Sequence, residues 1–173
     1  MEHWVKTAKS ATGKQVLWNL ETGTIQQTIE TEKIYNALPI SPDGKTVCQV
    51  GVKHIRFHHL QGRNMKSQRG VLRRKGNIQP FLAVEYLGNT AMVGTTDGHI
   101  YQFVDNELKS AFSAHTGATY ALYSCDSGLV SGGKDGLVKL WNAAMDLVET
   151  AFAQQSHRLQ NPSRWLLGPR PKQ

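Results

Sequence analysis

Short hydrophobic runs alternate with turn sequences along most of the chain, and their β-branched and aromatic residues favour β-strands. The turns contain Asp-Gly, Pro-Asp-Gly and Leu-Gly-Asn, which supply the positive φ angles that tight hairpins need. No segment between the runs has the periodicity of an amphipathic helix of ten or more residues. The sequence therefore predicts an all-β fold of antiparallel hairpins. The expected strands are 33–40, 46–50, 54–60, 81–87, 91–95, 100–104, 119–124, 129–131 and 137–141.

The strands also repeat along the chain. Residues 14–19 resemble residues 137–142, and two intermediate strands occupy equivalent places. The aromatic or histidine residues near the ends of these strands are separated by 40, 45 and 38 residues; they are Trp18, His58, Phe103 and Trp141. This spacing matches one four-stranded blade of a β-propeller, a unit that buries its faces only against neighbouring units.

One segment near the end of the repeated region has a specific resemblance. Residues 131–142, Ser-Gly-Gly-Lys-Asp-Gly-Leu-Val-Lys-Leu-Trp-Asn, resemble the closing half of a WD40 repeat, and Ala114-His115 resembles the Gly-His of that repeat. The resemblance implies a structural hydrogen-bond network through Trp141, Ser131, His115 and Asp135. Such a network is physically reasonable because a buried indole, hydroxyl and imidazole each need a partner.

A narrower resemblance covers about residues 35–142. The string Gly-Val-Lys-His-Ile-Arg-Phe at 51–57, the Leu-Gln-Gly at 60–62, and the basic stretch ending at Val71 are similar to the echinoderm microtubule-associated protein-like family. So is the later run from Ala114 to Tyr123. In that family the string lies in the first of two fused, imperfect propellers. The resemblance therefore implies a WD40-repeat protein that associates with microtubules.

The chain departs from the family pattern in several places. His58 and Phe103 stand where the repeat usually has Trp, and no Gly-His precedes strands 33–40 and 81–87. We therefore expect a complete network only in the last blade, and none around His58. The length accommodates about three full blades plus a partial one, so we expect an incomplete propeller that is a fragment. The expected organisation is the end of a partial blade at 1–20, WD40-like blades at 21–153 with a basic insertion at 61–77, and a basic disordered tail at 154–173.

Positive charge is concentrated in two segments of this chain, whose formal net charge is +7. Residues 61–77 carry six cations and no acid, residues 154–173 carry four cations and no acid, and the remainder is net −3. A basic segment on an acidic body indicates a polyanionic partner, although a solvated loop and a disordered tail explain the same charges. The candidate partner-binding residues are Arg63, Lys66, Arg69, Arg73, Arg74 and Lys75.

Other chemistry has little support in the sequence. Two distant cysteines form no zinc or disulfide pattern, and the histidines at 54, 58 and 59 lack further ligands in a metal-binding spacing. Ser131 has no nucleophile elbow around it, and Gly132-Gly133-Lys134 lacks the spacing of a phosphate loop. No apolar run reaches the roughly 18 residues that a transmembrane helix needs. We expect no catalytic residue, metal or cofactor.

The leading hypothesis is a non-enzymatic protein-interaction module in the cytoplasm, bound to the cytoskeleton. Its expected partners are tubulin or microtubules, with other proteins at the propeller faces and no membrane. Two alternatives remain open: a generic WD40 scaffold fragment, and a nucleic-acid-binding propeller that uses the same cations. The absence of aromatic residues from 61–77 counts against binding of single-stranded nucleic acid.

Overall fold

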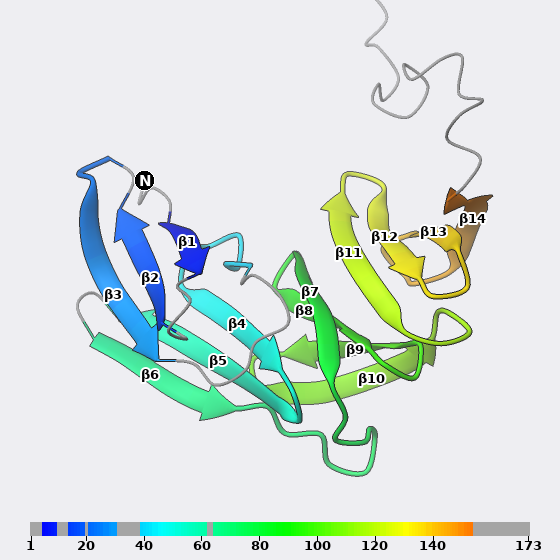
Figure 1. The fold of residues 1–173 in the computed structure, drawn as a ribbon, viewed down its shortest axis with the longest axis horizontal. Coiled ribbons are helices and arrows are strands. Elements are labelled where there is room, and N and C mark those ends of the chain that lie inside the picture. The colour runs from blue at the N-terminus through cyan, green and yellow to red at the C-terminus, as the bar shows by residue number, and fades with distance from the viewer. Residues whose placement is uncertain (1–4, 10–13, 20, 31–38, 62–63, 154–173) are drawn as a thin grey trace, which may run out of the picture.

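The computed structural model of this chain describes residues 5–9, 14–19, 21–30, 39–61 and 64–153. All the regular elements of these residues are β-strands, which form four antiparallel sheets (Figure 1). The all-β prediction is confirmed. The first sheet contains β1 (Val5–Lys9), β2 (Lys14–Asn19) and β3 (Thr24–Glu30). The second sheet contains β4 (Thr46–Gly51), β5 (His54–Gln61) and β6 (Asn64–Arg69). The third sheet contains β7 (Phe81–Leu87), β8 (Thr90–Thr95), β9 (His99–Val104) and β10 (Glu107–Ser113). The fourth sheet contains β11 (Thr119–Cys125), β12 (Gly128–Gly133), β13 (Leu137–Trp141) and β14 (Leu147–Phe152).

Within each sheet, every strand pairs with the one that follows it in the chain, so every sheet is a meander. The turns are short, and the predicted Asp-Gly turns have the expected geometry, with φ of +89° at Gly98 and +75° at Gly136. Gly98 is also closely packed, because a Cβ there would collide with the backbone oxygens of His115 and Gly117. These turns fix the register of each hairpin and hence the face that each side chain occupies.

The sheets follow one another along an arc, with the first and last sheets at its two ends (Figure 1). The second and third sheets share one apolar core, in which the rings of Phe57 and Phe103 lie 5.6 Å apart. The third and fourth sheets share another, in which the rings of Phe112 and Trp141 lie 5.0 Å apart. The described strands do not close into a ring, so the prediction of an incomplete propeller is confirmed.

Besides β1, the sequence pattern missed the last strand of every sheet, namely β3, β6, β10 and β14. These strands form one edge of their sheets and carry many exposed polar side chains, so they show little of the apolar alternation that marks the inner strands. Because β3 pairs with β2, the first sheet continues to Glu30 beyond the boundary expected at residue 20. Most of the expected strand 33–40, and the expected disordered tail at 154–173, lie outside the described residues; Ile40 forms an isolated bridge with Val47.

Candidate functional site

The basic segment expected as an insertion is in part a strand. Residues 64–69 are β6, which pairs regularly with β5 from Gln61↔Asn64 to Arg56↔Arg69. An edge strand of this kind needs no continuous apolar face, which is why its cationic sequence looked like a loop. The candidate cations divide between β6 (Lys66, Arg69) and the segment that follows it (Arg73, Arg74, Lys75), whereas Arg63 lies outside the described residues.

Residues 70–80, here called the connecting segment, link β6 to β7 and are held against β10. Val71 forms a parallel bridge with Glu107, supported by backbone hydrogen bonds of 2.7 and 2.9 Å to the start of that strand. The Arg73 guanidinium lies 2.5 Å from the Glu107 carboxylate, and Lys75 Nζ donates a hydrogen bond of 2.8 Å to the carbonyl of Lys109. The connecting segment therefore presents its cations from a defined position.

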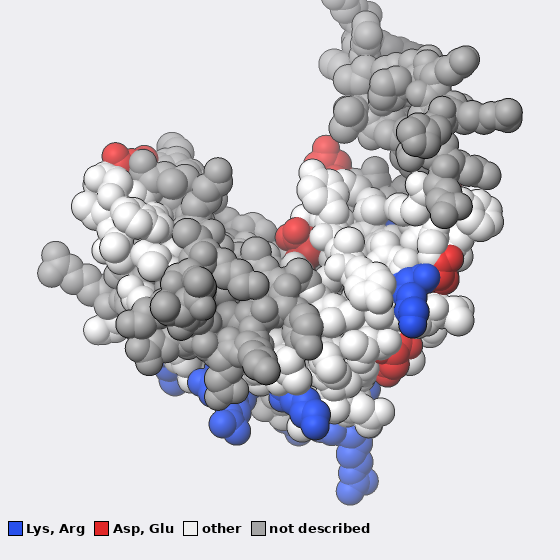
Figure 2. Space-filling model, viewed as in Figure 1, with Lys and Arg blue, Asp and Glu red and all other residues white. Residues whose placement is uncertain are grey.

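Charged side chains are segregated over the molecule. Figure 2 shows Lys and Arg along the lower rim of this view, where β6 and the connecting segment run in Figure 1, with Asp and Glu mainly on the upper and right-hand parts. We call the five described cations of this rim the basic surface; they are Lys66, Arg69, Arg73, Arg74 and Lys75. All five are exposed, so the charge of the basic surface faces solvent.

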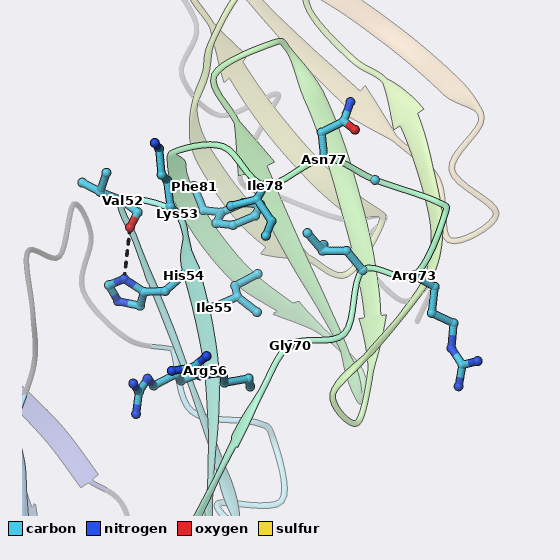
Figure 3. Close-up of a pocket in the computed structure, with 13 residues that line it drawn as sticks. Val52, Lys53, His54, Ile55, Arg56, Gly70, Arg73, Asn77, Ile78 and Phe81 are labelled. Atoms are coloured by element: carbon cyan, nitrogen blue, oxygen red, sulfur yellow. Dashed lines mark hydrogen bonds between the residues drawn. The ribbon is translucent and has the colours of Figure 1, made fainter.

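A pocket of about 850 Å³ lies between the start of β5 and the connecting segment (Figure 3). Among the described residues that line it, four are cations, namely Lys53, Arg56, Arg69 and Arg73, and none is a carboxylate. Ile55, Leu72, Ile78 and Phe81 supply apolar lining. We call this feature the basic pocket. Lys53 and Arg73 both adopt left-handed backbone conformations, with φ of 60° and 50°, as residues in tight turns do.

The sequence pattern did not single out Lys53 or Arg56 as site residues, because both lie outside the cation-rich 61–77 segment. Arg56 reaches the basic pocket only because β5 and β6 pair in a register that puts it directly opposite Arg69. The one available signal was the alternation of His54, Arg56 and His58 along a predicted strand, which places these three side chains on one face.

The four residues of the expected network are joined by hydrogen bonds in the fourth sheet. Trp141 Nε1 donates to Ser131 Oγ over 2.8 Å, and the Ser131 hydroxyl donates to His115 Nε2, also over 2.8 Å. His115 Nδ1 donates to the Asp135 carboxylate over 2.9 Å. Desolvation alone would raise the pKa of Asp135, but two backbone N–H donors and His115 outweigh it and lower that pKa. This hydrogen-bond network ties the loop before β11 to β12, β13 and the turn between them.

The second sheet contains a network that the sequence did not predict. His58 is 3% exposed; its Nε2 donates to Gln49 Oε1 over 2.7 Å, and the Ser67 hydroxyl donates to Nδ1 over 2.8 Å. The expectation that His58 lacks a network is therefore wrong. Gln49 and Ser67 come from the strands on either side of β5, and nothing in the Gly-His and Trp pattern indicates them. Desolvation, with smaller contributions from Arg56 and His59, lowers the pKa of His58 to about 4.

The arrangement of His115, Ser131 and Asp135 does not resemble a working hydrolase site. Ser131 is completely buried, and its Oγ accepts the indole hydrogen of Trp141, so no substrate reaches it. In the part of the chain that the structure describes, no three His, Cys, Asp or Glu side chains are grouped as metal ligands would be. A search of these same residues found no helix with the length and apolar character needed to cross a bilayer.

Comparison with known proteins places the chain among propellers. No protein-family model matches the sequence. The sequence is 26% identical over 138 residues to echinoderm microtubule-associated protein-like 2 of Rattus norvegicus. The matched region covers 76% of this chain and 21% of that relative. Solved structures with the same fold include the Myceliophteria thermophila Cps50 (Swd1) β-propeller domain, with a TM-score of 0.68 and 14% identity over 86% of this chain and 53% of that one. This chain forms part of a WD40-type β-propeller.

Two further structures support the WD40-type fold. A chain in the mitotic checkpoint complex has a TM-score of 0.64 and 19% identity, over 80% of this chain and 44% of that one. The computationally designed Ika4 protein has a TM-score of 0.60 and 20% identity, over 80% of this chain and 84% of that one. The resemblance to the echinoderm microtubule-associated protein-like family is supported by weak similarity to one member, of which this WD40-type chain spans about a fifth.

Proposed function

We propose that this WD40-type chain is a non-enzymatic protein-interaction module that attaches to microtubules in the cytoplasm through its basic surface. The observation that carries the proposal is the exposed set of cations on β6 and the connecting segment. Backbone pairing holds both in place, β6 against β5 and the connecting segment against β10. Such a surface attracts an acidic protein and orients it during association. The similarity to a microtubule-associated protein-like sequence supports tubulin as that acidic protein.

The test is co-sedimentation of the full chain with microtubules. Replacement of Arg69, Arg73, Arg74 and Lys75 with Gln removes four charges of the basic surface. The matched control replaces four cations elsewhere with Gln: Arg158, Arg164, Arg170 and Lys172. We expect the first variant to lose most of its microtubule binding at low salt and the control to retain it. Unmodified protein should dissociate as ionic strength rises, because exposed charges are screened beyond about 8 Å at physiological salt.

A second arm uses microtubules whose acidic tubulin tails have been removed by proteolysis. If the basic surface binds those tails, their removal should weaken binding as strongly as the four Gln substitutions do. Equal affinity of the parent and the four-Gln variant across a salt titration would refute the proposed attachment. Binding to nucleic acid that competes with microtubules at equal charge concentration would favour the nucleic-acid alternative instead.

A further inference from the structure

The basic pocket is lined by two arginines at directly opposed positions of neighbouring strands. Arg56 on β5 and Arg69 on β6 are cross-strand partners, which places their side chains on the same face of the sheet. Both side chains line the pocket, and Lys53 lines the same pocket from the turn before β5. Like charges at directly opposed positions destabilise a sheet. The pairing therefore has a cost in the unoccupied protein that an anion between the two groups would remove.

No described carboxylate forms an ion pair with either arginine. Arg73, the fourth cation of the lining, is different, because it is paired with Glu107 and points away from the pocket (Figure 3). Within the described part of the chain, the positive charge of the pocket that no carboxylate neutralises therefore comes from Lys53, Arg56 and Arg69. Guanidinium groups bind carboxylates through two parallel hydrogen bonds, which makes this arrangement well suited to acidic side chains.

Much of the remaining lining is apolar, although His54 and Asn77 also contribute to it. Ile55 and Phe81 are buried at the base of the basic pocket, whereas Ile78 is 67% exposed at its edge. Figure 3 shows Ile78 and Phe81 beside each other, with Lys53 and Arg56 on the β5 side. A small inorganic anion would leave the exposed side chain of Ile78 in water. A peptide that carries both carboxylates and one hydrophobic side chain would use both parts, and 850 Å³ has the size of a ligand pocket.

We propose that the basic pocket binds a short acidic peptide segment in which one hydrophobic side chain is flanked by carboxylates. The carboxylates contact Arg56, Arg69 and Lys53, and the hydrophobic side chain covers the exposed side chain of Ile78. This inference rests on the proposed function in that it names the part of an acidic protein partner that the site recognises. It adds a requirement that long-range electrostatic attraction does not have, namely one apolar residue at a fixed place.

The probe is a fluorescent peptide of six glutamates with a central phenylalanine, measured by fluorescence anisotropy against the full chain. Two matched peptides carry serine in place of phenylalanine, or glutamine in place of glutamate. We expect the serine peptide to bind about tenfold more weakly, as burial of an aromatic side chain implies, and the glutamine peptide to show no binding. Equal affinity for the phenylalanine and serine peptides, or full displacement by inorganic phosphate at the same charge concentration, would overturn the proposal.

Protein variants give an independent readout. Arg56→Gln and Arg69→Gln should each bind the probe at least tenfold more weakly, and each should melt at a higher temperature than the parent without peptide. Lys134→Gln, which changes the same charge in the β12–β13 turn, should alter neither property. Ile78→Ser should weaken binding of the phenylalanine peptide but not of the serine peptide. Parental affinity in Arg56→Gln and Arg69→Gln, or melting below the parent, would refute the inference.

The peptide assay contains no tubulin, so its outcome is separate from that of the sedimentation assay. If the peptide binding predicted here is not observed but salt-sensitive microtubule binding is, the pocket inference is refuted and the basic surface acts only as a general electrostatic contact. Peptide binding as predicted, in a chain that does not sediment with microtubules, would uphold the pocket and overturn microtubules as the partner.

Discussion

Protonation of His58 should destabilise this protein in mildly acidic solution. His58 has a pKa of about 4 in the folded chain, against an ordinary value of 6.5, because its side chain is desolvated within the second sheet and lies near Arg56 and His59. The folded state therefore binds fewer protons than the unfolded state between these two values. The contribution of neutral His58 to the free energy of unfolding is fully present above about pH 6.5 and is lost as the pH falls towards 4. A difference of about 2.5 pKa units corresponds to about 3 kcal/mol.

The measurement is the free energy of unfolding in urea at a series of pH values between 7.5 and 4. The comparison variant is His58→Gln, which does not titrate but can still hydrogen-bond to Gln49 or Ser67. Below pH 6 the parent should lose up to about 1.4 kcal/mol more per pH unit than the variant does. Carboxylates with lowered pKa values, such as Asp97 and Asp135, are present in both proteins and cancel in the difference.

His59→Gln serves as the matched control, since it removes the neighbouring imidazole but keeps the buried one. It should retain the steep pH dependence of the parent. If the parent and His58→Gln lose stability in parallel from pH 6.5 to 4, then the buried, neutral state of His58 is not what the folded protein requires, and the reasoning fails.

Three further outcomes are expected. Trp141→Ala should lower the stability measured in thermal melts by about 3–5 kcal/mol, because it removes a buried ring and the indole N–H that donates to Ser131. Trp18→Ala should cost clearly less, since Trp18 is 36% exposed. Gly70→Ala should cost about 1–3 kcal/mol in urea unfolding, because the added Cβ would collide with Ile55; an unchanged midpoint would contradict this packing. We expect the chain to self-associate through exposed aromatic side chains of β11, and Tyr123→Lys should reduce this in sedimentation velocity, because Tyr123 is 66% exposed; a strictly monomeric parent would contradict it.

Local sequence pattern was sufficient for the inner strands and insufficient for the outer ones. Val47, Val93 and Leu129 are completely buried at the predicted inner strands, where packing between sheets requires apolar side chains. In β14, by contrast, the apolar residues do not alternate with polar ones, and Leu147, Val148 and Phe152 are exposed, so no apolar face marks the segment as a strand. Strand pairing creates these outer elements, and pairing is a property of the assembled sheet rather than of the segment.

The candidate site shows the same division. Charge density along the chain identified five of the cations that the structure places on one rim. It could not identify the basic pocket, because Arg56 and Arg69 are thirteen residues apart and meet through register. His58 shows the limit of motif comparison as well. Its partners Gln49 and Ser67 satisfy a buried imidazole with different chemistry from that of the Trp141 network.

The arrangement of the cores has a consequence for how the molecule opens. The third sheet contributes to both apolar cores, whereas the fourth contributes to one. In a linear array of this kind, cooperativity is local and the outermost members unfold most easily. Amide hydrogens of β8 and β9 should therefore exchange most slowly with solvent, and those of β14 much sooner. The basic pocket lies where β5 and the connecting segment meet, next to the slowest-exchanging sheet, so it should keep its shape while β14 repeatedly detaches and returns.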